Sequence, residues 1–91
     1  MAEFYTGEFG PARPLEITMP FDPTIYTTIT IDITKPDSSK ISVVPTSQTT
    51  TYLRYTPTST DWSVSGTYDV QITCSTPTNK RRARATFTVD A

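Results

Sequence analysis

The segment Gly66–Val89, GTYDVQITCSTPTNKRRARATFTV, contains two runs of alternating apolar and polar residues on either side of a polar turn. Apolar residues at every second position are typical of strands with one buried face. They are Tyr68, Val70, Ile72 and Cys74 before the turn, and Ala83, Ala85, Phe87 and Val89 after it. Because the first set is even-numbered and the second odd-numbered, they share one face only if the loop length is even. We therefore predict a hairpin with a four-residue loop, Thr76–Asn79.

This register also predicts which side chains meet on the outer face of the hairpin. Gln71 would lie opposite Arg84 and Thr73 opposite Arg82, with Asp69 diagonal to Arg84 and able to screen its charge.

The segment Ile25–Ile33 predicts a second strand with the same two-residue period. One face would carry Ile25, Thr27, Ile29, Ile31 and Ile33, and the other Tyr26, Thr28, Thr30 and Asp32. Tyr26, Thr28 and Thr30 would then form an outward contact face.

Shorter alternating runs predict further strands at Leu15–Met19, at Ile41–Val43 and around Leu53 and Tyr55, each ended by a proline. Between them, Pro36 suits the second position of a type I turn, with Asp37 bonding nearby amides. Trp62 and Val64, in a loop that crosses between sheets, would cover one end of the core. With twenty threonines and no helical period, residues 15–91 are predicted to form one all-β domain, a two-sheet antiparallel β-sandwich of six or seven strands.

Residues 1–14 have no sustained period and are predicted to form an extended N-terminal arm. Phe4, Tyr5 and Phe9 give it three aromatic rings, which favours packing on its own domain or on a neighbouring chain, and a disordered terminus is the alternative. These rings are candidate partner-binding residues, and deletion of residues 1–14 is expected to leave the fold intact.

The residues argue against catalysis. The chain has no histidine, its single thiol, Cys74, falls on the inner face, and its carboxylates are scattered. No calcium-loop or glycine-rich phosphate-binding pattern is present. We therefore expect no enzyme activity, no metal and no cofactor.

The basic cluster Lys80, Arg81, Arg82 and Arg84 is the sharpest local signal. Lys80, Arg82 and Arg84 share the outward face, where charges two residues apart are separated by about 6.6 Å. Three interpretations stay open: a solvated strand protected by charge against edge pairing, an ionic contact with an acidic protein neighbour, and a nucleic-acid contact.

The formal net charge of −1 gives no overall attraction to a polyanion. The sequence has no apolar run long enough for a membrane span and no pattern of a secretory signal, so a protein made in the cytoplasm is expected. A lone cysteine also disfavours a disulfide-linked extracellular domain.

Four stretches, YTGEFGPARPLEITM, ITKPDSSKISV, YLRYTPTSTDWSVSGTYDVQI and ATFTV, resemble the immunoglobulin-like N-terminal domain of bacteriophage baseplate upper proteins and related tail modules. Gly7, Glu8 and Gly10 match a Gly-acid-x-Gly element, and Gly66, Thr67 and Tyr68 match a Gly-x-Tyr element. The family's Lys-Pro-Asp-Gly turn has Ser38 in place of glycine here, which predicts a different turn type. Gly66 would permit a tight corner and Tyr68 would form a tyrosine corner.

The resemblance implies an immunoglobulin-like fold and a noncatalytic structural protein of the virion. Such a protein would occur in symmetric copies and dock on other virion proteins in the tail, baseplate or neck, or as capsid decoration. The candidate docking residues are Phe4, Tyr5, Phe9, Lys80, Arg82 and Arg84. A host-surface or carbohydrate-binding module is the alternative, followed by nucleic-acid contact through the basic last strand.

Overall fold

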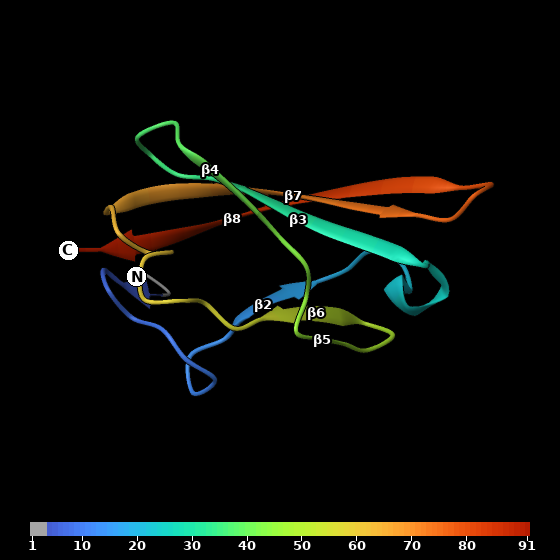
Figure 1. Cartoon of the computed structure of the whole chain (residues 1–91), viewed down its shortest axis with the longest axis horizontal. Helices are drawn as coiled ribbons and strands as arrows, with labels where there is room; N and C mark the ends of the chain where they lie inside the picture. Colours follow the sequence, from blue (N-terminus) through green and yellow to red (C-terminus); the bar gives the residue numbers. More distant parts are fainter. Residues whose placement is uncertain (1–3) are drawn as a thin grey trace.

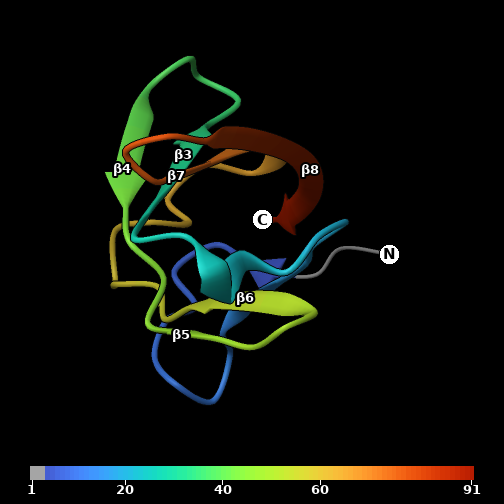
Figure 2. The same ribbon diagram turned by 90° about the vertical axis from the view of Figure 1, so that its right-hand side faces the viewer.

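The computed structural model describes residues 4–91 and consists of two β-sheets that face each other (Figures 1 and 2). One sheet has five strands in the order β1-β8-β7-β3-β4, and the other has three in the order β2-β6-β5. The strands are β1 (Phe4–Tyr5), β2 (Leu15–Thr18), β3 (Thr28–Thr34), β4 (Lys40–Val43), β5 (Ser47–Gln48), β6 (Tyr52–Tyr55), β7 (Gly66–Ser75) and β8 (Lys80–Asp90). The only helical element among the described residues is a short 3-10 turn, η1 (Pro23–Ile25). The all-β prediction is confirmed.

The β7–β8 hairpin has the predicted register along its whole length. Ser75 pairs with Lys80, which leaves a four-residue loop, and the pairing continues without a bulge to Gly66 and Val89. On the outer face Arg84 lies opposite Gln71, and its guanidinium bonds the diagonal carboxylate of Asp69 at 2.7 Å. The hairpin is the longest element of the molecule and spans its upper layer in Figure 1.

The core lies between the sheets and follows the two-residue period. Alternate residues of β3, β7 and β8 are buried, and they face Leu15, Ile17, Leu53 and Tyr55 from the smaller sheet. The buried set from the larger sheet is Phe4, Ile29, Ile31, Ile33, Tyr68, Val70, Ile72, Cys74, Phe87 and Val89. Trp62, from the crossing loop, is completely buried as well.

The predicted strand Ile25–Ile33 is wrong at its first residues. Asp22 caps η1 by accepting the Thr24 amide at 2.9 Å, and Pro23 has the fixed φ that favours a helical first turn. The chain therefore enters β3 only at Thr28, and Ile25 is 67% exposed instead of facing the core. Tyr26 is buried against Phe21 rather than outward, so the predicted contact face does not include it.

The first described residues do not extend freely from the domain but pack against it. Phe4 and Tyr5 form β1, which pairs in parallel with Val89 and Asp90 at the end of β8. The larger sheet is therefore mixed rather than antiparallel. Because Phe4 is buried in the core, deletion of residues 1–14 is now expected to destabilise the fold. Residues 1–3 of the predicted arm lie outside the described residues.

The turn between β3 and β4 places Ser38 in a conformation that favours glycine. The Ser38 amide donates to the Lys35 carbonyl at 2.9 Å, which closes a turn around Pro36. The Asp37 carboxylate accepts the Ser39 amide at 3.0 Å, as predicted for Asp37. Ser38 has a φ of +73°, the left-handed conformation that glycine adopts without strain. The turn thus keeps a geometry suited to glycine although a serine occupies the position.

We predict that Ser38→Gly stabilises the protein. Removal of the left-handed strain outweighs the extra backbone entropy of the unfolded chain, for a net gain of about 0.5–1 kcal/mol. Urea unfolding should show a higher midpoint with an unchanged slope. As a control, Ser47→Gly in the extended, exposed strand β5 should lower the midpoint. A lower midpoint for Ser38→Gly would contradict the argument.

Candidate functional site

The basic row, defined as Lys80, Arg82 and Arg84, lies on the solvent-facing side of β8. All three side chains are exposed, because even-numbered residues of this strand point away from the core. Arg84 is partly neutralised by Asp69, in a pair whose side chains remain 69% and 45% exposed and which therefore adds little stability. Within residues 4–91, neither Lys80 nor Arg82 has an ionic partner.

Arg81 belongs to the opposite face of β8. Its guanidinium carbon lies 4.2 Å from the centroid of the Phe21 ring, which itself packs edge-on against Tyr26. This cation–π contact closes the hairpin end of the core. The cluster of four basic residues is therefore divided: three charges face solvent and one covers apolar rings.

The three N-terminal aromatic residues have different positions. Phe4 is buried against Trp62 and Phe87, with ring centroids 5.3 and 5.6 Å away, so it contacts its own domain rather than a partner. Tyr5 and Phe9 are 58% and 59% exposed. Of the predicted aromatic docking residues, only Tyr5 and Phe9 are accessible.

The Gly-acid-x-Gly element holds the segment that carries these two rings. Gly7 and Gly10, with φ of +84° and +100°, donate their amides to the carbonyls of Trp62 and Pro57 in the crossing loop. The Glu8 carboxylate accepts the Tyr5 amide at 2.6 Å and contacts Arg13 at 3.2 Å. The backbone around Tyr5 and Phe9 is thus fixed on the body of the domain by main-chain bonds.

The Gly-x-Tyr element forms the corner before β7. Gly66 has a φ of +133°, and a Cβ there would lie 2.7 Å from the Pro36 side chain, so only glycine fits. The Tyr68 hydroxyl donates to the Val64 carbonyl at 2.6 Å and accepts the Val64 amide at 3.2 Å. Both residues therefore have the structural roles predicted for them.

A buried polar group that the sequence pattern did not predict is the carboxylate of Asp61. It accepts the Tyr55 hydroxyl at 2.5 Å, and the Thr58 amide and hydroxyl at 2.9 Å each. These bonds hold the crossing loop against β6. Burial, the hydrogen bond and the carboxylate charge together raise the pKa of Tyr55 well above its usual range. The sequence did contain an indication of this bond, because a Tyr55 that faces the core needs a hydrogen-bond partner for its hydroxyl.

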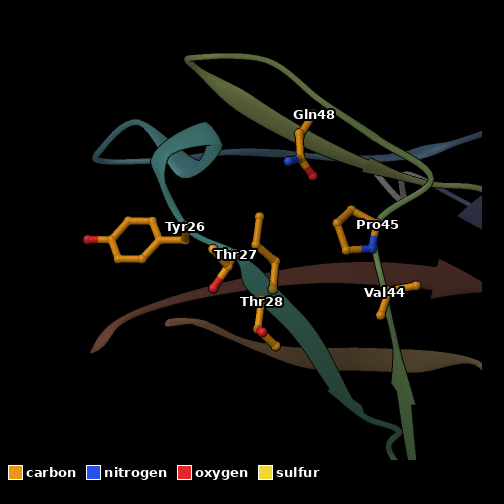
Figure 3. Close-up of a pocket in the computed structure, with 7 residues that line it drawn as sticks. Tyr26, Thr27, Thr28, Val44, Pro45 and Gln48 are labelled. Atoms are coloured by element: carbon orange, nitrogen blue, oxygen red, sulfur yellow. The ribbon is translucent and has the colours of Figure 1, made fainter. Parts of the chain in front are cut away.

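A shallow depression lies where the chain passes from β4 to β5 (Figure 3). Val44 and Pro45 flank it on one side, and Thr27 and Thr28 at the start of β3 on the other. Gln48 reaches it from β5, and Val44 is 68% exposed. None of its lining residues is charged, and the apolar residues Ile29, Val44 and Pro45 form part of the lining.

The remaining candidates for chemistry lie in the interior. Cys74 is completely buried, and burial raises the pKa of its thiol. Trp62 is also fully buried, so its ring has no face for a sugar to stack on. Among residues 4–91, no three His, Cys, Asp or Glu side chains gather in a way that would hold a metal ion, and no helix has the length and hydropathy needed to cross a membrane.

Comparisons of the chain with protein-family models, with curated proteins and with solved structures found no match.

The Tyr55–Asp61 bond predicts alkaline sensitivity. Because the pKa of Tyr55 is higher in the folded chain, stability is complete below about pH 10, where the unfolded tyrosine titrates, and falls as the pH rises further. Tyr55→Phe should reduce this alkaline decline. At pH 7 the same substitution should also lower the free energy of unfolding by about 1–3 kcal/mol, because the buried Asp61 carboxylate loses a hydrogen-bond donor.

Urea unfolding at several pH values between 7 and 11 would measure both effects. Tyr5→Phe, at an exposed ring, is the matched control and should leave the stability at pH 7 unchanged. An unaltered slope in Tyr55→Phe would contradict the assignment.

Proposed function

We propose that the chain is a noncatalytic structural protein of a bacteriophage virion, an immunoglobulin-like domain that docks on neighbouring virion proteins during assembly. The proposal joins two parts, a fold assignment and a docking role. Each is supported by separate features of the molecule.

The strand order supports the immunoglobulin-like assignment. In that fold one sheet carries strands B, E and D and the other C, F and G. Here β2-β6-β5 faces β3-β7-β8, with β4 beyond β3, so the chain follows the same connections. The Tyr68 hydroxyl bonds backbone four residues upstream, as in a tyrosine corner at the start of strand F. The short parallel strand β1 beside β8 extends the second sheet.

One observation carries the docking role: Tyr5 and Phe9 are exposed on a backbone that is already fixed. Exposed aromatic rings supply much of the binding energy of protein interfaces. A segment held by Gly7, Gly10 and Glu8 does not have to be ordered when it binds, which lowers the entropic cost. These rings are therefore suited to contact a neighbouring protein.

The resemblance of the sequence to phage baseplate and tail modules supplies the identity of the neighbours. The elements that carry it, Gly7–Gly10 and Gly66–Tyr68, lie at the N-terminal segment and at the corner beside it, and both contribute to this end of the domain. In the proposal, copies of the chain occupy equivalent positions in the particle. Such repetition makes weak individual contacts sufficient.

The test is the double variant Tyr5→Ser and Phe9→Ser. Because both rings are exposed, unfolding stability should change by less than about 0.5 kcal/mol for each substitution. Loss of two interface rings should weaken docking at least about tenfold. The measurement is the amount of the protein in purified particles from infected cells, relative to another virion protein.

Ile25→Ser is the matched control, since Ile25 is equally exposed but lies on η1, apart from the N-terminal segment. It should be incorporated normally. Normal incorporation of the folded double variant would show that these rings are not the docking residues.

A further inference from the structure

Strand β8 has one side without a full strand partner. It pairs with β7 along its length, but on its other side β1 covers only Val89 and Asp90. In the described chain, Lys80–Thr88 has no strand beside it there, and we call this the open edge. In Figure 2, which looks along the long axis, β8 lies toward one side of the larger sheet, with only the short β1 beyond it in the strand order, and β4 lies at the opposite margin.

The backbone bonds identify which residues face the open edge. The Asp90 carbonyl accepts the Thr6 amide at 2.8 Å, so Asp90 directs its carbonyl away from β7. Main-chain groups alternate along a strand, and β8 has no bulge. Within the open edge, the even-numbered residues therefore direct their N–H and C=O groups away from β7, and these residues include Lys80, Arg82 and Arg84.

The two faces beside the open edge differ in chemistry. On the solvent side lies the basic row, of which Lys80 and Arg82 have no ionic partner in the described chain. On the inner side, between β8 and the edge of β2, a groove is lined mainly by apolar side chains. They are Leu15, Ile17, Val70, Ala85 and Phe87, of which only Ala85 is partly exposed, and the polar residues Glu16, Thr18 and Thr86 complete the lining.

We propose that the open edge binds an extended segment of another protein whose residues alternate between acidic and apolar. The segment adds to the sheet as a strand beside β8. Its acidic side chains lie across from Lys80 and Arg82, and its apolar side chains enter the groove beside Ala85. This inference rests on the proposed docking role and names its partner.

Charge selects this occupant over a second copy of the same strand. Pairing of two β8 edges would concentrate two basic rows on one face, and like charges across strands are destabilising. An acidic strand instead pairs with Lys80 and Arg82, while the main-chain bonds supply affinity that is independent of sequence. The chain itself already uses the far end of this edge in the same way, through β1.

The probe is a nine-residue peptide of alternating glutamate and valine, added to the full chain at neutral pH and low salt. Amide hydrogen exchange by NMR should show new protection at Arg82 and Arg84, whose amides face the open edge. Ala83 and Ala85 should not change, because their amides already face β7. The corresponding lysine–valine peptide should not bind.

Substitutions at Arg82 separate charge from main-chain pairing. Arg82→Ala should weaken binding about two- to fivefold, the value of one cross-strand charge pair. Arg82→Pro also removes the edge amide and should abolish binding without loss of a bond to β7. Lys40→Glu, on the opposite edge of the same sheet, is the matched charge control and should bind as the wild type does.

Protection that alternates along β8 and is lost in Arg82→Pro would support strand addition. Absence of binding, equal binding of the lysine peptide, or binding without protection at Arg82 and Arg84 would overturn it. The assay does not depend on particle assembly, so it can fail while the docking role of Tyr5 and Phe9 stands.

Discussion

The structure depends on the burial of one side chain, Trp62, among aromatic rings from distant parts of the sequence. Its ring centroid lies 5.3 Å from Phe4, 5.5 Å from Tyr68 and 4.9 Å from Phe87. Each such pair adds about 0.5–1.5 kcal/mol beyond the burial of its area. The indole Nε1 has no hydrogen-bond partner within the described chain, so packing alone must outweigh its desolvation. The cluster joins the N-terminal segment, the crossing loop and the last hairpin.

The β7–β8 hairpin was predictable because its register depends only on residues that are close together in the sequence. Alternation fixes the buried face, and parity then fixes the loop length, so the pairing of Arg84 with Asp69 followed from the sequence. Ile25 was not predictable from the same pattern. The turn η1, capped by Asp22, occupies Pro23–Ile25, so that β3 begins only at Thr28, and alternation cannot detect that change.

The candidate site was likewise predicted only in part. The basic row was predicted correctly as outward-facing, because its positions belong to the hairpin. The burial of Phe4 depends on β1 pairing with the far end of the sequence, and no local pattern specifies that contact. Asp61 lies only six residues from its partner Tyr55, but alternation predicts the direction of a side chain and not the partner of its hydroxyl.

The pairing of β1 with β8 also affects the order in which the molecule can form. Its two strands come from opposite ends of the described chain, so their contact closes nearly the longest possible loop, and contacts of this kind slow folding. On the ribosome, Phe4 emerges early but finds its partner Val89 only when synthesis of the domain is almost complete. Until then Trp62 lacks its contact with Phe87, and the ring cluster that encloses it is incomplete.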